Sequence, residues 1–450
     1  MEDADIKNII DDIEYLAAAK DNAMILNILI GNHPADIATI IQGLPKEEAR
    51  FVFGLLDADT ASDVLVELDD VTTDKLVADL RHERLSEIVD EMDSDDATDL
   101  VADLPEAVAE KVLESIDQED SAEVKELLRH EEDSAGGIMA LEFVTVWEGA
   151  SVDQAVKEIR TKADEVDEVY NVYAVDRVGK LVGFVPLKRL LLAKSSQKVS
   201  EIMRTDVVSV PIHMDQEEVA NIFGRYNLVS MPVVDDSGKL VGRITVDDIV
   251  DVMNEEASED IQKMAGIADE EGIRETSIVK ISLGRLPWLL VAFGGQLFAA
   301  FVLRQFQVSL KQIVAATLFI PLMMAMGGNT GIQAATIIVR GIALGELGHG
   351  STFKRLVREV RVSLFNGTVV GTLLFFAVGI FFNSQFGAVV SVSVLIVILN
   401  ASIVGAGIPL ILHKFKVDPA IATGPLVSTC NDILGVSIYL SLVTLSLKYL

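Results

Sequence analysis

The pattern of hydrophobic and polar positions divides the chain into two halves. In the first half, apolar residues recur at helical spacing in short segments such as residues 35–44 and 85–92. In the second half, the apolar stretches are long enough to cross a bilayer, and they run over residues 286–303, 313–339, 363–382, 388–412 and 420–447. The pattern therefore predicts a soluble half followed by five membrane spans.

Charge follows the same division. The 450 residues have a formal net charge of −32, although 50% of them are hydrophobic. Residues 285–450 hold four acidic and eleven basic side chains, a net charge of +7, which leaves −39 for residues 1–284. This distribution excludes a plain soluble enzyme, a secreted disulfide scaffold and a nucleic-acid binder, and the single cysteine, Cys430, cannot form an internal disulfide.

The distribution of basic residues predicts the orientation. The acidic start of the chain is unlike a signal peptide, so we expect the soluble half in the cytosol. Five spans then place the C-terminus outside, in the plasma membrane of the cell. Seven basic residues fall in the inner loops and three on the outer side, as the positive-inside rule requires. The inner set is Arg340, Lys354, Arg355, Arg358, Arg361, Lys414 and Lys416; the outer set is Arg304, Lys311 and Lys448.

The soluble half is expected to contain three parts. Residues 1–138 are predicted to form an all-α superhelical domain with an acidic surface. An internal repeat with a period of 59 follows, in which residues 172–183 align with residues 231–242 as strand, glycine turn and strand. This β-turn-β unit with flanking helices resembles a tandem pair of CBS domains, which implies an α/β pair over residues 139–200 and 201–253 that senses nucleotides or ions.

The second repeat contains a candidate nucleotide site. Its Thr245-Val-Asp-Asp248 segment matches the Thr/Ser-x-x-Asp pattern that often holds a ribose in CBS domains, so Thr245 and Asp248 are candidate ATP-binding residues. The first repeat has Pro186-Leu-Lys-Arg189 at that place, which argues against a site there. The alternative is a helix N-cap, which needs the same residue types.

Residues 254–284 are expected to connect the CBS pair to the membrane. Glu255 with Glu259, and Glu256 with Asp260, stand four residues apart, so like charges share one face of a helix. A bound metal ion would neutralise them; a solvated acidic face is the alternative.

Asp432 is the acidic residue placed deep within a predicted span. It is twelve residues beyond the start of the fifth stretch, or roughly 18 Å along a helix, near the middle of the hydrocarbon layer. A carboxylate there is costly unless it meets water, a cation or a partner. Glycines and neutral oxygens surround it in the sequence, including Asn329 and Ser428, which favours a cation pathway over a protonated structural aspartate or simple tight packing.

The expected ligands are all oxygen atoms, which favours Mg²⁺ or Ca²⁺ over copper or zinc. Mg²⁺ keeps much of its water and binds through one or two carboxylates. One aspartate per chain suits this chemistry if a two-fold dimer brings two copies to one axis.

The whole chain resembles the MgtE family of magnesium channels and transporters. The matching segments are His33-Pro-Ala-Asp36, Glu131-Glu-Asp-Ser-Ala-Gly-Gly-Ile-Met139, Gly327-Gly-Asn-Thr-Gly-Ile-Gln333, and Asp418-Pro-Ala-Ile-Ala-Thr-Gly-Pro425 through Asn431-Asp432. The resemblance implies a homodimer in which each chain has a superhelical N-terminal domain, a CBS pair, a plug helix over residues 254–284 and a five-helix transmembrane domain over residues 285–450. It also implies Mg²⁺ uptake, a selectivity site for hydrated Mg²⁺ at Asp432 with the Ser428 backbone oxygen and Asn329, and closure by cytosolic Mg²⁺.

By the same resemblance, Mg²⁺-sensing acids would line the cytosolic interfaces, and Asp418 would meet the plug. The sensing set is Asp63, Asp95, Asp99, Asp215, Glu217, Asp248, Glu256, Glu259 and Asp260. Asn227 is neutral where the family can have an acid. The alternatives are a transporter of Co²⁺ or Ca²⁺ and a nucleotide-regulated membrane sensor that conducts nothing. No hydrolase motif such as H-E-x-x-H is present, so no enzyme is expected.

Overall fold

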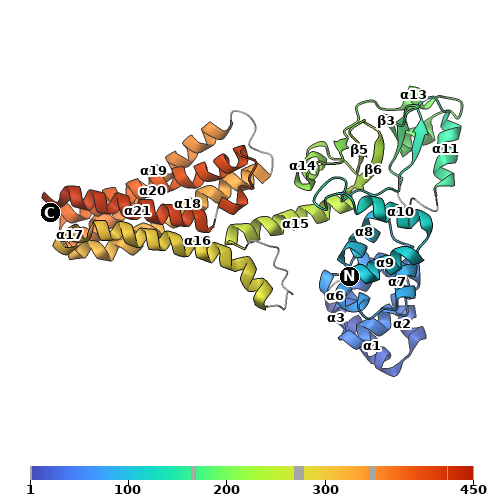
Figure 1. The fold of residues 1–450 in the computed structure, drawn as a ribbon, viewed down its shortest axis with the longest axis horizontal. Helices are drawn as coiled ribbons and strands as arrows, with labels where there is room; N and C mark the ends of the chain where they lie inside the picture. The colour runs from blue at the N-terminus through green and yellow to red at the C-terminus, as the bar shows by residue number, and fades with distance from the viewer. Residues whose placement is uncertain are drawn as a thin grey trace. The chain divides into compact units, whose positions relative to one another are not determined.

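The computed structural model describes residues 3–163, 166, 169–267, 278–343, 351–422 and 424–448. The chain forms two compact units, Met1–Val252 and Met253–Leu450 (Figure 1). Each unit is described by itself.

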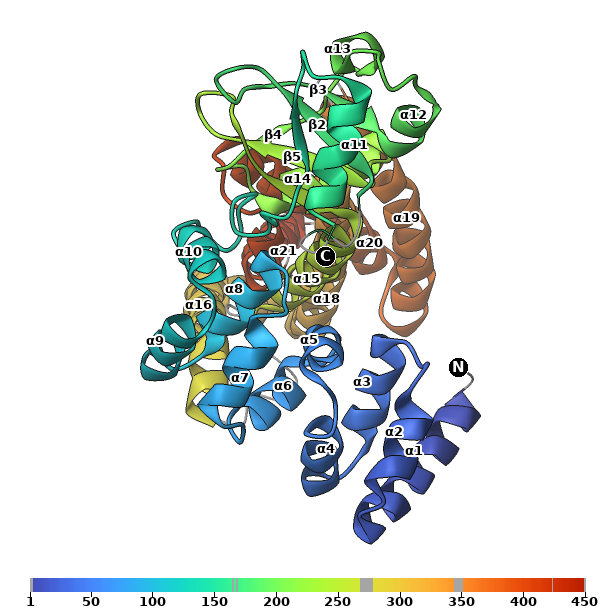
Figure 2. The same ribbon diagram turned by 90° about the vertical axis from the view of Figure 1, so that its right-hand side faces the viewer.

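The first unit begins with helices, as the sequence predicts, and ten of them are described. Helices two apart along the chain pack on each other, such as α3 on α5, α5 on α7 and α7 on α9, which gives a superhelical stack (Figure 2). Their apolar faces form one continuous core that includes Ile40, Val52, Phe53 and Ile88. The helices are α1 (Asp3–Ala19), α2 (Asn22–Leu29), α3 (Pro34–Gly43), α4 (Lys46–Phe53), α5 (Ala58–Val66), α6 (Asp70–Val77), α7 (His82–Val89), α8 (Ser94–Asp103), α9 (Glu106–Ser115) and α10 (Gln118–Leu127).

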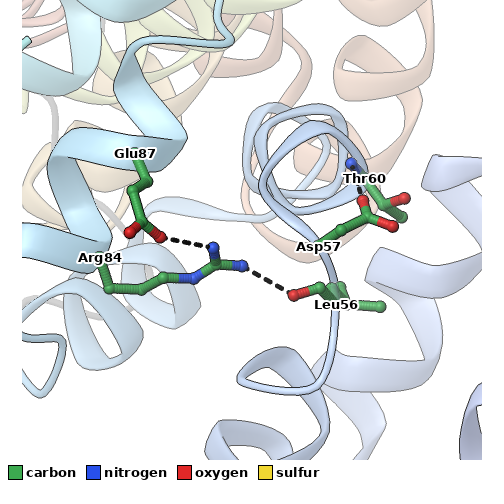
Figure 3. Close-up of polar contacts among 5 residues, drawn as sticks. All are labelled: Leu56, Asp57, Thr60, Arg84 and Glu87. Carbon is green, nitrogen blue, oxygen red and sulfur yellow. Dashed lines mark hydrogen bonds and ion pairs between the residues drawn. The ribbon is translucent and has the colours of Figure 1, made fainter.

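Polar side chains define where these helices begin and tie them together. Asp57 caps α5 by accepting a 2.9 Å hydrogen bond from the backbone N–H of Thr60. Arg84 of α7 donates to the carbonyl oxygen of Leu56, just before α5, at 2.7 Å and to Glu87 at 3.0 Å (Figure 3). Aspartate suits the start of a helix because it both accepts from the free N–H groups and suits the positive end of the helix dipole.

Two similar three-stranded sheets follow, one in each copy of the repeat. In both sheets the first strand is parallel to the second, and the second is antiparallel to the third. Gly179 and Gly238 have φ of +87° and +81° in the turns between the antiparallel strands, which explains the glycine in each copy. The strands are β1 (Thr145–Trp147), β2 (Asn171–Val175), β3 (Leu181–Pro186), β4 (Val210–Pro211), β5 (Ser230–Val234) and β6 (Leu240–Thr245).

The predicted helices of the repeat, residues 152–161 and 216–225, are present as α11 (Val152–Thr161) and α14 (Gln216–Tyr226). The helices α12 (Leu187–Leu192) and α13 (Val199–Ile202) complete the first copy. Asn227 ends α14 with φ of 51°, a left-handed conformation that asparagine tolerates well. The short parallel strands β1 and β4 were not predicted, because two or three residues carry no periodicity.

The second unit is helical. It takes in most of α15 (Val246–Ala265), whose acidic half was predicted; residues 268–277 of the expected connecting segment lie outside the described residues. The remaining helices are α16 (Ile278–Gln305), α17 (Gln307–Gln312), α18 (Ile320–Ala343), α19 (Ser351–Phe381), α20 (Ser384–Lys414) and α21 (Pro425–Leu445), with 3-10 turns at Val314–Phe319, Ala420–Ala422 and Ser446–Lys448.

Among the described residues of this unit, five segments are long and apolar enough to cross a membrane, in agreement with the predicted number. They are Ile281–Gln305, Val314–Ala343, Lys354–Phe381, Ser384–Lys414 and Pro425–Leu445. The core between them includes Met323, Val394 and Tyr439, and the hydroxyl of Tyr439 donates to the carbonyl oxygen of Ala316 at 2.9 Å. That bond satisfies a carbonyl in the 3-10 turn, which matters where no water reaches the backbone.

Candidate functional site

Asp432 lies on α21, the last membrane-length helix. Pro425 is the first residue of this helix, a position where proline costs no hydrogen bond. The helix starts five residues later than the predicted stretch. Asp432 is therefore about 10 Å from the start of α21 and about 4.5 Å before the central residue of the helix, Gly435. It remains within the span, and its side chain is half-buried in a single chain.

A second polar side chain meets Asp432. The Nε2 group of Gln296, on α16, donates a 2.7 Å hydrogen bond to Oδ2 of Asp432. Gln296 is exposed on the surface of the unit. An amide and a carboxylate therefore share one outward-facing position on two membrane-length helices.

The glycines near Asp432 bring helices into close contact and do not break one. The helix α18 continues through Gly327, Gly328 and Gly331. A β-carbon at Gly405 of α20 would overlap the backbone of Gly331, and a β-carbon at Gly331 would overlap the side chain of Asn431. These glycines therefore allow the close approach of α18 to α20 and α21.

The neutral polar residues take different positions around this contact. A β-carbon at Gly328 would lie 3.5 Å from Oγ of Ser428, so α18 and α21 touch there, and exposed Asn329 follows directly. Asn431 is only 1% exposed, and neither atom of its amide has a hydrogen-bond partner in the part of the chain that the structure describes. Asn431 therefore faces the packed helices, whereas Asp432, the next residue, meets Gln296.

An acidic group lies where α15 approaches the chain before α21. Lys263 of α15 forms ion pairs with Glu259 of the same helix and with Asp418, whose Oδ2 is 2.8 Å from the Lys263 ammonium. Burial raises the pKa of Asp260 to about 6, and the negative charge of Asp418 adds to this effect. The structure thus brings Glu259, Asp260 and Asp418 together, as the sequence expected, and adds a lysine that the sequence did not single out.

A second acidic group forms within the first unit, between α8 and the start of α15. Burial and the charge of Asp248 raise the pKa of Asp95 well above its usual range. Burial, with repulsion from Asp248 and Asp93, raises the pKa of Asp96 to about 7. Partial loss of hydration and the charge of Glu132 raise the pKa of Asp99 to about 6. Carboxylates held this close favour either protonation or a bound cation.

The other predicted sensing residues lie on α5, at the start of α14 and on α15. Asp63 lies on α5, and Glu256 lies on α15. Asp215 caps α14 by accepting from the backbone N–H of Glu217 at 3.0 Å. The charges that act on Asp95 come from Asp93, Asp96, Glu142 and Asp248.

The candidate nucleotide residues form a helix cap. Asp248 Oδ2 accepts hydrogen bonds from the backbone N–H and the hydroxyl of Thr245, at 2.9 and 2.8 Å, at the start of α15. This is the geometry of the alternative that the sequence left open. An ATP site at Thr245 and Asp248 stays a prediction.

Several residues of these groups escaped the sequence analysis. Glu142 accepts from the backbone N–H and hydroxyl of Ser94, at 3.0 and 2.9 Å, at the start of α8. Asp90, Asp117 and Asp120 bring carboxylate oxygens within 4.8 Å of one another. No local pattern marks the contacts of Glu142 and Asp90, because Glu142 is 48 residues from Ser94 and Asp90 is 27 residues from Asp117. Gln296 is different, because a glutamine inside an apolar span stands out in the sequence as a candidate functional residue.

In the described residues, a helical domain and a CBS pair are followed along the chain by five membrane-length helices. This organisation defines a multipass membrane protein with a large soluble part. Comparison with known proteins agrees. Residues 320–442 match the family model for a divalent cation transporter, MgtE; residues 32–133 match the MgtE intracellular N domain, and residues 135–196 and 199–255 match CBS domains.

The chain is 37% identical over 328 residues to the magnesium transporter MgtE of Thermus thermophilus, covering 73% of each chain. It is 35% identical over 325 residues to the magnesium transporter MgtE of Bacillus subtilis, covering 72% of each chain. A solved structure, described as the soluble part of a magnesium transporter, is 27% identical and covers 56% of this chain and 99% of its own, with a TM-score of 0.52. The chain belongs to the MgtE family of magnesium transporters. Transporters of this kind are not enzymes.

Proposed function

We propose that this chain carries Mg²⁺ into the cell through a pathway at Asp432, and that cytosolic Mg²⁺ closes the pathway by binding at the acidic groups. The observation that carries the proposal is the outward-facing pair of Gln296 and Asp432 on membrane-length helices. A carboxylate facing lipid is strongly unfavourable, so that surface needs to face water, ions or protein. The carboxylate and amide oxygens are ligands suited to Mg²⁺ and its bound water.

The same surface supports a homodimer. One carboxylate provides a weak site for a divalent ion, and a two-fold axis beside Asp432 would supply a second. The second copy would also cover a surface that is polar at Gln296 and Asp432. We therefore assign Asp432, the Ser428 backbone oxygen and Asn329 to the selectivity site of a dimeric pathway in the plasma membrane, with the C-terminus outside.

The acidic groups support the regulatory part of the proposal. Asp95, Asp96, Asp99 and Asp248 lie close together with raised pKa values, so their ionised forms repel one another. A divalent cation would replace that repulsion by attraction and stabilise the compact arrangement. Residues 254–284 would act as the plug, linking residues 1–138, 139–200 and 201–253 to the transmembrane domain at residues 285–450.

Influx of Mg²⁺ into vesicles that contain the purified chain tests the proposal. We expect Asp432→Asn to abolish influx, while Asp206→Asn, on the surface of the first unit, leaves it intact. Mg²⁺ added to the cytosolic face should reduce influx steeply. Wild-type influx in Asp432→Asn would remove Asp432 from the pathway. Preferential flux of Co²⁺ or Ca²⁺ would favour another divalent cargo, and no flux of any cation would favour a non-conducting sensor.

A further inference from the structure

The hydrogen bond between Gln296 and Asp432 joins two residues 136 positions apart, on α16 and α21. We propose that Gln296 is a positioning residue that sets ion specificity: it engages one oxygen of the Asp432 carboxylate and so disfavours ions that bind a carboxylate through both oxygens. This inference rests on the proposed role of Asp432 in the pathway.

Close approach of the two helices makes the contact possible. A β-carbon at Gly295 would overlap the side-chain methyl group of Thr429, so α16 and α21 meet directly at this pair. Gln296 and Asp432 follow one and three residues later, where the side chains span the remaining gap. Gly294, one residue earlier on α16, faces open space within its unit, so the requirement for a small residue is specific to position 295.

The geometry leaves the two oxygens of Asp432 unequal. Oδ2 accepts from Gln296 at 2.7 Å, and Oδ1 has no hydrogen bond among the described residues. The bond also restricts rotation of the carboxylate, since turning it toward a cation with both oxygens would break the contact with Gln296. The carboxylate therefore presents one oxygen in a defined direction.

This arrangement discriminates between hard cations by their coordination. Ca²⁺ takes six to eight oxygen ligands and often binds a carboxylate through both oxygens. Mg²⁺ demands octahedral geometry, keeps several waters and is held by single carboxylate oxygens or through its water. The side-chain oxygen of Gln296 can accept a hydrogen bond from such a water. The hydrogen bond from Gln296 to Oδ2 therefore removes one oxygen ligand from Ca²⁺ and has little effect on the binding of hydrated Mg²⁺.

The test measures the concentration of external Ca²⁺ that halves Mg²⁺ influx into vesicles containing the full-length protein. In Gln296→Met, which has similar length and no donor, we expect that concentration to fall about tenfold, the factor that corresponds to one hydrogen bond to a charged group. In Gln296→Glu, which has nearly the same shape, we expect a larger fall, because a second carboxylate adds ligands for Ca²⁺. Gln305→Met and Gln305→Glu make the same changes at the end of α16, about 14 Å away, and should match wild type.

The relative size of the effects in Gln296→Met and Gln296→Glu distinguishes a role in ion specificity from a purely structural role. If Gln296 only supported packing, the near-isosteric Gln296→Glu would be the milder change and Ca²⁺ block would stay as in wild type; that result would overturn the inference. Unchanged Ca²⁺ block in both Gln296 variants would do the same. The Asp432→Asn variant tests the underlying assignment separately. Normal Mg²⁺ influx in Asp432→Asn would contradict the role of Asp432 itself. If Asp432→Asn loses influx but the Gln296 variants show the same Ca²⁺ block as wild type, only the inference about Gln296 is contradicted.

Discussion

The ammonium group of Lys263 lies 2.8 Å from Oδ2 of Asp418 and also pairs with Glu259. These are two of the acids expected to meet through Mg²⁺ near the inner end of the last span. Lysine thus supplies, within one chain, a positive charge where a divalent cation is proposed to bind. Burial lowers the pKa of Lys263, but the ion pairs with Asp418 and Glu259 outweigh it and raise the pKa above its usual range, so the side chain stays charged at neutral pH.

Replacing Lys263 tests whether it stabilises the closed arrangement in the absence of Mg²⁺. In Lys263→Gln, the carboxylates of Glu259, Asp260 and Asp418 lose their compensating charge and repel one another. We expect higher influx when cytosolic Mg²⁺ is low, and a larger relative inhibition when Mg²⁺ is added. The measurement is the dependence of influx on cytosolic Mg²⁺, with Lys414→Gln as control. Equal influx in wild type and Lys263→Gln at low Mg²⁺ would contradict this role.

The raised pKa values on α8 predict a dependence of stability on pH. A carboxyl group whose pKa is raised in the folded state stabilises that state at low pH, and the contribution is lost as pH rises through the folded value. For Asp96 and Asp99 the loss falls between about pH 4 and pH 7. Without Mg²⁺, the soluble half should therefore lose stability over that range, and added Mg²⁺ should restore it at neutral pH.

The variant Asp96→Asn tests how much the ionised carboxylate of Asp96 lowers the stability of the folded protein. At pH 7.5 without Mg²⁺ we expect it to raise the free energy of unfolding by at most about 4 kcal/mol, since Asp96 is half-buried and one pKa unit corresponds to about 1.4 kcal/mol. At pH 4 the difference from wild type should vanish. Thermal unfolding of the full-length protein at both pH values would show this, and a difference that does not change with pH would refute the assignment.

The contact between Glu142 and Ser94 should hold the first turn of α8. Loss of the carboxylate in Glu142→Ala leaves the backbone N–H and hydroxyl of Ser94 without their acceptor, at a cost of about 1 kcal/mol. Glu142→Gln keeps one oxygen and should lose less. Amide hydrogen exchange in residues 94–98, with and without Mg²⁺, measures the difference. Equal protection in Glu142→Ala and wild type would show that the cap is dispensable.

Close packing of α18 and α20 predicts opposite outcomes at two neighbouring glycines. In Gly405→Ala, the new methyl group would overlap the backbone of Gly331, which has no rotamer to change, so we expect a loss of about 1–3 kcal/mol and reduced influx. In Gly407→Ala, the new methyl group meets no atom within 4 Å, and we expect equal or slightly higher stability because alanine favours the helix. Thermal unfolding and influx of the two variants test the pair, and equal behaviour would contradict the packing.

Most of the elements, and their order along the chain, could be predicted from the sequence. Five spans, the short helices before them and the two β-turn-β copies all follow from hydrophobic periodicity, which is a property of neighbouring residues. It also identified Asp432 as unusual, because a carboxylate in an apolar stretch stands out without any knowledge of the fold. It placed the start of the last helix five residues too early, since the apolar residues Ala420–Ala422, which form a 3-10 turn, extend the apolar pattern of the helix that begins at Pro425.

Which side chains meet depends on how the helices pack and could not be predicted from the sequence. Gln296 reaches Asp432 because α16 and α21 touch at Gly295, and Glu142 reaches Ser94 across 48 residues of chain. The pairing of Lys263 with Asp418 likewise joins segments far apart in sequence. Such contacts depend on where helices cross, and a crossing depends on side chains of both helices at once. Local pattern therefore predicts that acidic groups exist, while packing decides which charges they face.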